Sequence, residues 1–343
     1  MKKTLVALAA ISAVTAAMAD VTIYGTIEQT YKSASQTTDG VLDSKSTSIG
    51  EYQMGTSLIG FKGSEDMGSG MKASFLYEMG INAQTSATAP LNRQAYVGLS
   101  GDFGALRIGK QYSSSFNNLV SADPGGATGA PGALYLAVNV SNNGSESPLR
   151  QDSAIQYDLP TIASGLKVTL TKVAAGHDTS DGGSKVGDSQ GFAINYASGS
   201  LNVGYTSDST KSQDIMFGTS TTVVTAVDGT STKQNTLSAG YDLGMAKVTY
   251  SDAKVMNNGE GIKASMFALS APVGAATVFV SSSTGKIVLT SDETKLKGMQ
   301  YGFNYPMSKR TVAYYHAGNT TITDSSNSQT KIKGFGLGVH HSF

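Results

Sequence analysis

The sequence predicts an all-β protein: a transmembrane antiparallel up-and-down β-barrel of about 16 strands. Three observations predict it. Apolar and polar residues alternate in many short segments, the connections between them alternate in length, and the final segment ends on an aromatic residue. An alternating strand presents one face to each side of a sheet, and a closed sheet satisfies its backbone groups inside a bilayer. A secreted β-protein that stays outside the membrane is the alternative.

The alternating segments follow one another along the whole chain without a domain break. In the first, Val21, Ile23, Ile27 and Tyr31 share one face. The two segments near 93–100 and 105–111 alternate poorly. The expected strands lie near 21–32, 54–62, 71–81, 93–100, 105–111, 150–159, 166–171, 192–196, 201–206, 235–241, 245–254, 262–270, 275–283, 296–305, 310–317 and 331–343.

The connections distinguish a membrane barrel from a soluble sandwich. Tight links take turns with longer ones rich in Ser, Thr, Asp and Gly, which is the outer-membrane pattern of short turns on one rim and loops on the other. Tyr and Phe recur at strand ends, where interfacial girdles lie. A soluble sandwich has no reason to keep this alternation. The tight links are 63–70, 101–104, 197–199, 242–244, 271–274 and 306–309.

The two ends of the chain carry further signals. Met1 to Ala19 has a basic start, an apolar stretch and small residues before Asp20, which predicts a secretory signal peptide and a barrel domain over 20–343. An uncleaved anchor is disfavoured because the apolar stretch is shorter than the roughly 20 residues a spanning helix needs. In the last strand, one face carries Phe335, Leu337, Val339 and Phe343.

Composition excludes several classes of protein. Removing the signal peptide leaves 23 of the 25 basic side chains against 25 acidic ones, so nucleic-acid binding gains no support. The chain has no Cys, which excludes disulfides and thiolate metal sites. Forty Gly, 16 Tyr and no Trp indicate many short strands and turns.

One connection is much longer than the others. It runs over 112–149 and contains a turn-rich stretch at 123–132. A loop of this length in a compact protein is usually functional or disordered. Folded into the barrel, it would narrow a lumen that about 16 strands leave wide. A loop that stays outside the barrel is the alternative.

Four stretches and the last residue resemble the Gram-negative porins, especially those of β-proteobacteria: Val21–Gly25, Gly60–Asp66, Asn92–Leu99, Ser308–Thr311 and Phe343. The resemblance implies a homotrimer of 16-stranded barrels in the outer membrane. Each pore would be filled with water, need no cofactor and be narrowed by the third external loop. Ions and small hydrophilic solutes would cross by passive diffusion.

The resemblance also implies wall arginines facing acidic side chains of that loop. Arg93 and Arg150 match two such positions, and the third falls on Leu58. With one positive charge missing, we expect a weaker anion preference than in relatives with three arginines. Arg93 could instead only tether the loop or a neighbouring subunit. The other expected pore-lining residues are Lys62, Lys72, Lys167, Asp152 and, as the acidic partner, Asp123.

A second implication of the resemblance concerns assembly. Phe343, with the outward residues Val339, Leu337 and Phe335, matches the signal that the outer-membrane assembly machinery reads. The last strand must also pair with the first, because an open sheet edge is not tolerated in lipid.

Several patterns imitate catalytic or metal sites. The stretch 187–191 fits the G-x-S-x-G pattern but enters a strand, not the required strand-to-helix turn. Gly334, Gly336 and Gly338 resemble part of a nucleotide loop, yet no helix follows. We therefore expect no enzyme. A substrate-specific channel, a barrel enzyme and a surface adhesin are the alternative functions. The remaining candidate ligands are His177, His316, His340, His341, Asp178, Asp181 and Asp188.

Overall fold

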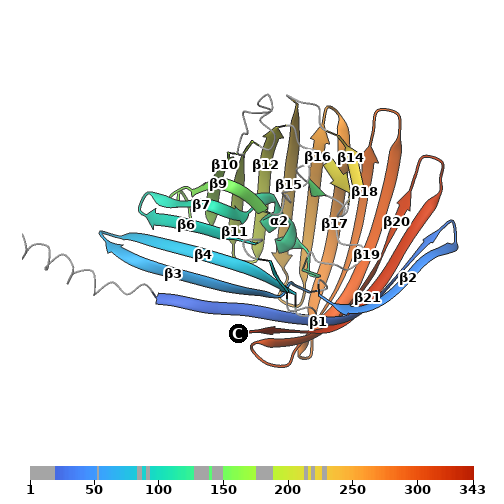
Figure 1. Cartoon of the computed structure of the whole chain (residues 1–343), viewed down its shortest axis with the longest axis horizontal. Helices are drawn as coiled ribbons and strands as arrows, with labels where there is room; N and C mark the ends of the chain where they lie inside the picture. Colours follow the sequence, from blue (N-terminus) through green and yellow to red (C-terminus); the bar gives the residue numbers. More distant parts are fainter. Residues whose placement is uncertain are drawn as a thin grey trace, which may run out of the picture.

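The protein is a closed antiparallel β-barrel of 16 strands, as the sequence predicts (Figure 1). The computed structural model describes residues 20–51, 54–82, 87–89, 93–126, 139–140, 150–174, 188–211, 215–217, 221–225 and 230–343. The expected signal peptide, residues 1–19, lies outside the described residues, and Asp20 opens the first strand.

The first half of the wall has irregular strands. Its segments are β1 (Asp20–Thr38), β2 (Val41–Gly50), β3 (Leu58–Gly68), β4 (Met71–Asn82), β5 (Ala87–Ala89), β6 (Ala95–Gly101), β7 (Gly104–Tyr112) and β9 (Arg150–Asp158). The second half is more regular, with β10 (Leu166–Val173), β11 (Ser189–Ser198), β12 (Leu201–Lys211), β15 (Ser231–Asp242), β16 (Lys247–Asn257), β17 (Glu260–Val273), β18 (Ala276–Val288), β19 (Glu293–Pro306), β20 (Thr311–Thr323) and β21 (Gln329–Ser342).

Two of the barrel strands are interrupted. The segments β2 and β3 lie end to end beside β1, and β5 and β6 lie end to end beside β4. Eighteen segments therefore form 16 strands. The sequence analysis missed β2, whose Ser and Lys residues weaken its apolar alternation. A separate small sheet joins β8 (Asn139–Val140), β13 (Ile215–Phe217) and β14 (Thr221–Val224).

The barrel closes where its last strand meets its first. The register runs from Thr26 opposite Ser342 to Thr38 opposite Thr330. Beyond it, the Phe343 N–H donates to the Gly25 carbonyl (3.0 Å) and the Gly25 N–H donates to the Phe343 carbonyl (3.2 Å). A Cβ atom on Gly25 would overlap the Phe343 ring, so the missing side chain makes room for the terminal aromatic.

The two faces of the wall have the polarity of a membrane barrel. Large apolar side chains on the outer face are exposed: Ile23 is 60% exposed and Phe267 is 57% exposed. Polar side chains such as Thr206, Ser251 and Gln300 are almost fully buried on the inner face. This is the reverse of a soluble protein, whose surface is mostly polar and whose core is apolar. No helix in the described part of the chain is long and apolar enough to cross a membrane.

The two rims differ as expected, with one correction. The rim that holds Asp20 and Phe343, which we call the turn rim, carries short turns between β3 and β4, β6 and β7, and the later pairs up to β19 and β20. The opposite rim, which we call the loop rim, carries the long connection after β7. However, two loop-rim connections are also tight, at Asp39–Gly40 and Asn258–Gly259. In both, the two residues have positive φ, as a two-residue hairpin turn requires.

We predict that deleting Phe343 lowers the yield of folded barrel several-fold. The deletion removes two backbone hydrogen bonds and an aromatic ring at the seam, the junction where the last strand pairs with the first. The folded fraction is measured by its resistance to SDS at room temperature. Protein that does fold should keep its single-channel conductance. The control is Phe267→Leu, which removes an exposed aromatic ring from β17, a strand that does not take part in closing the barrel. Equal folding yields for the deletion and this control would contradict the prediction.

Candidate pore constriction

A short helix lies inside the barrel at the start of the long connection (Figure 1). Helix α2 (Ser114–Ala122) begins at Ser113, whose side chain accepts a hydrogen bond from the Phe116 N–H (3.1 Å). The sequence analysis expected only a loop here. A serine followed by apolar residues at 116, 119 and 120 is the signal that could have identified the helix.

Polar and apolar contacts fix α2 against one side of the wall. Ser115 bonds Thr206 (2.8 Å) and Asp208 (2.7 Å) on β12, and the Thr249 hydroxyl of β16 donates to the Ala122 carbonyl (2.5 Å). Leu119 belongs to a buried apolar cluster with side chains of β16, β17, β18 and β19. The long connection therefore enters the lumen, which confirms that part of the predicted fold.

The acidic residue after the helix has a different partner from the one expected. The Gln300 amide of β19 donates to Asp123 Oδ1 (2.7 Å), as does the Gly125 N–H (2.8 Å), and Asp123 is buried. The Gln300 contact of Asp123 is on the same side of the wall as α2. The carboxylate beside Arg93 is instead Glu78.

The two predicted arginines meet at the residue that begins the long connection. The Arg93 guanidinium donates to the Tyr112 hydroxyl and to Thr56 Oγ1 (both 2.5 Å), and Glu78 Oε2 lies 3.8 Å from its Nε. Arg150 donates to the same hydroxyl (3.4 Å), and its guanidinium carbon lies 5.0 Å from the centre of the Tyr112 ring. Arg93 therefore contacts the residue that begins the long connection, and its role in lining the pore stays a prediction.

The other predicted lining residues are dispersed. Leu58 is only 9% exposed, so it is buried and offers almost no surface to a pore. Lys62 Nζ lies 5.0 Å from the centre of the Tyr24 ring, and Lys72 is exposed near the turn rim, opposite Asp66. Asp152 pairs with Lys110 (2.7 Å) next to a bulge at Ser153, whose φ is positive.

A second charged group, which the sequence analysis missed, links three strands of the wall. Asp158 accepts from Arg107 (3.0 Å) and lies 3.1 Å from Lys167 Nζ, while the Thr169 hydroxyl donates to it (2.6 Å). Lys167 and Arg107 thus share one carboxylate, which neutralises them only in part. Arg107 lies in the segment that alternates poorly, because a register shift interrupts the pairing of β7 with β9.

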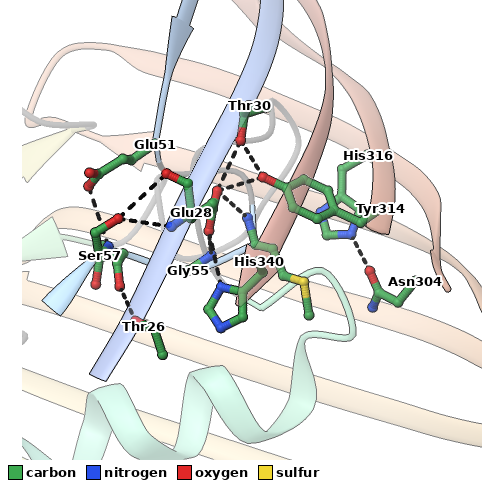
Figure 2. Close-up of polar contacts among 12 residues, drawn as sticks. Thr26, Glu28, Thr30, Glu51, Gly55, Ser57, Asn304, Tyr314, His316 and His340 are labelled. Carbon is green, nitrogen blue, oxygen red and sulfur yellow. Dashed lines mark hydrogen bonds and ion pairs between the residues drawn. The ribbon is translucent and has the colours of Figure 1, made fainter. Parts of the chain in front are cut away.

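Near the seam, a buried carboxylate holds a second inward segment (Figure 2). Residues 54–57, which precede β3, lie beside the inner side of β1. Glu28, which is fully buried, accepts from the N–H of Gly55 (2.6 Å) and from the hydroxyl of Tyr314 (2.6 Å). His340 is the cross-strand neighbour of Glu28 on β21, and its Nδ1 atom lies 3.6 Å from Glu28 Oε2. Because Thr56 of this segment contacts Arg93, the Glu28 group supports the arginines.

The inward groups lie on opposite sides of the lumen. Glu78 and Arg93 are at β4 and β6, whereas α2 contacts β12, β15 and β16. In the order of the closed sheet, β4 and β16 are half the circumference apart. The arginines and residues 54–57 therefore lie across the lumen from α2 and Asp123.

Comparison with known proteins decides the family. A sequence model of the Gram-negative porins matches residues 4–325, nearly the whole chain. The chain belongs to the Gram-negative porin family. This porin is 28% identical, over the full length of both chains, to the major outer membrane protein P.IB of Neisseria meningitidis. It is also 28% identical to outer membrane porin protein 32 of Delftia acidovorans, over 97% of this chain and 93% of the relative.

Solved structures agree on the fold. An anion-selective porin from Comamonas acidovorans superposes with a TM-score of 0.76, at 22% identity, covering 95% of this porin and all of that chain. The OmpF of Salmonella typhi superposes with a TM-score of 0.67 at 14% identity. The resemblance identified in the sequence and the barrel that it implies are therefore confirmed, and the porin is an outer-membrane channel.

The sequence patterns that imitate catalytic or metal sites gain no support as such sites from the structure. Within the part of the chain that the structure describes, no group of three His, Cys, Asp or Glu residues is arranged to hold a metal ion. His177, Asp178 and Asp181 lie outside the described residues, as does Gly187 of the G-x-S-x-G pattern. The family and fold point to a channel and not to an enzyme.

We predict that Glu28→Gln lowers the free energy of unfolding by about 1–3 kcal/mol, because a buried charged acceptor with several donors is replaced by a weaker one. Urea titration of the detergent-folded porin measures the change. Glu65→Gln, an exposed position on β3, is the control and should change stability by less than about 0.5 kcal/mol. Equal losses in the two variants would contradict a structural role for Glu28.

Proposed function

We propose that this porin is a general diffusion channel for ions and small hydrophilic solutes, narrowed between the arginine cluster and α2. The observation that carries the proposal is the closed barrel with a polar lumen, into which the arginine cluster and α2 project from opposite parts of the wall. Such a channel selects solutes by size, by charge and by the cost of removing water at the narrowing. It requires no cofactor and no chemical step.

We further propose that its preference for anions is weak. Glu78 lies beside Arg93, and Asp158 lies between Arg107 and Lys167, so several of the basic groups are partly neutralised. Leu58 adds no charge. In a narrow passage, fixed charges sort ions even though salt screens them over about 8 Å. The comparison porin described as anion-selective shares the fold with this chain, and we expect this porin to be less selective.

Assembly is the third part of the proposal. Cleavage of residues 1–19 would leave Asp20 as the first residue, and the mature barrel would form a homotrimer in the outer membrane. One of the comparison structures, OmpT of Vibrio cholerae, is described in a trimer form. The assembly machinery would recognise Phe343 together with the outward side chains of Phe335, Leu337 and Val339, which are all partly exposed.

We predict a reversal potential close to zero in a potassium chloride gradient across a planar bilayer. Replacing the neutralising acids, as in the double variant Glu78→Gln, Asp158→Asn, should move the potential in the anion-selective direction. Glu65→Gln is the control and should leave it unchanged, because Glu65 lies on the outer face with Gly63 and Ala73. Wild-type anion selectivity equal to that of porins with three wall arginines would refute the proposal.

We also predict that sugars, phosphate and amino acids reduce single-channel conductance without saturating at millimolar concentration, since a general channel has no dedicated binding track. The measurement is a blocking titration of single channels. Saturable block by one class of solute would instead identify a substrate-specific channel.

A further inference from the structure

Four lysines form a continuous row on the outside of the barrel, and we propose that this row binds the phosphate groups of outer-leaflet glycolipids. In the registers of three adjacent strand pairs, Lys254 of β16 is opposite Lys263 of β17, Lys263 is opposite Lys286 of β18, and Lys286 is opposite Lys295 of β19. Nothing in the pore function requires this arrangement.

The row faces outward. The residues next to the lysines along the strands are buried on the lumen side, in the apolar cluster around Leu119 of α2. They are Ala253, Val255, Ile262, Ile287 and Leu296. Since successive side chains of a strand point to opposite faces, the lysines lie on the other side of the wall. All four are exposed. Solutes in the lumen therefore cannot reach them.

Like charges directly opposite each other destabilise a sheet. Adjacent strands are about 4.8 Å apart, so four lysines in register span about 14 Å. Among the described residues, only Lys286 has an acidic partner, Glu293, at 3.0 Å. Asp252, two residues from Lys254, is the other nearby acid on this face, and Lys297 adds a further positive charge beside Lys295. The row keeps a net positive charge, which an external anion would neutralise.

The height of the row in the membrane indicates what that anion is. On β16 and β17, Lys254 and Lys263 are four residues from Tyr250 and Phe267, two exposed aromatics of the lipid-facing band. Four residues of a strand cover about 13 Å, and the lysines are on the side toward the loop rim, close to the Asn258–Gly259 turn. Flexible lysine stems reach from such a position to the headgroup level.

The loop rim of a porin faces the cell exterior, so the nearest headgroups are those of the outer leaflet. The inference depends on this membrane placement and is independent of the proposed ion preference. A row of ammonium groups about 14 Å long suits a headgroup with more than one phosphate, because each lysine near an anionic membrane surface adds to the attraction. The described structure offers no comparable lysine row on the remaining strand pairs.

The test compares lipid binding by full-length variants folded in detergent. The row variant carries Lys254→Gln, Lys263→Gln, Lys286→Gln and Lys295→Gln. The control variant carries Lys45→Gln, Lys172→Gln, Lys211→Gln and Lys309→Gln, which removes four exposed but scattered lysines and gives the same change in net charge. Native mass spectrometry measures binding of bisphosphorylated lipid A, of its dephosphorylated form and of inorganic phosphate.

We expect the row variant to bind bisphosphorylated lipid A about tenfold more weakly than wild type, and the control variant to bind like wild type. The dephosphorylated lipid should bind weakly to all three. The proposal is overturned if both variants lose affinity equally, if removing the phosphates has no effect, or if inorganic phosphate binds the wild type as tightly as the lipid.

Two further measurements separate this result from misfolding and from failure of the pore proposal. The matching Lys→Arg variant at the four row positions should keep lipid binding. Single-channel conductance of the row variant should equal that of wild type, because the lysines lie outside the lumen. Loss of lipid binding in the arginine variant would refute a charge-based site.

Discussion

Hydrogen bonding of the backbone determines this structure, because a strand inside lipid has no water to bond with. Every strand must therefore have a neighbour on both sides, and a sheet satisfies this requirement only by closing. Here the last strand pairs with the first from Thr26 to Thr38, and Phe343 continues the pairing at Gly25. The register of all the intervening strands has to bring these two ends together. Pairing at the seam therefore depends on the geometry of every strand in the wall.

Closure leaves an interior that the protein fills with polar contacts. Ser115, Thr206 and Asp208 hold α2 on one side, while Glu28 holds residues 54–57 on the other. Apolar packing contributes where Leu119 meets the wall. The narrowing of the lumen thus depends on side-chain hydrogen bonds that water can compete for, whereas the wall depends on backbone hydrogen bonds that lipid protects. The two parts of the molecule can change independently, which lets pore properties vary on one barrel.

The sequence predicted the wall well and its interior less well. Alternation along β1 and β21 identified the outward side chains because the period of a strand is a local property. The Gln300 contact of Asp123 and the Glu28 group were missed because they depend on contacts between residues far apart in the chain. Helix α2 was missed although its local signal, Ser113 before apolar residues, was present. The shift at Ser153 similarly interrupts a pattern that alternation alone would continue. Leu58 illustrates the same limit: its position along the strand was clear, but its burial depends on what covers it.

The contact between Gly25 and Phe343 also bears on how the protein folds. It joins two residues far apart in the chain, so the wall closes only once both β1 and β21 are available to pair. Contacts of such high sequence separation make folding slow. Until then, strands with long apolar faces stay unpaired and prone to aggregate. A barrel that closes between its first and last strands therefore has to keep both from pairing with other chains until they meet.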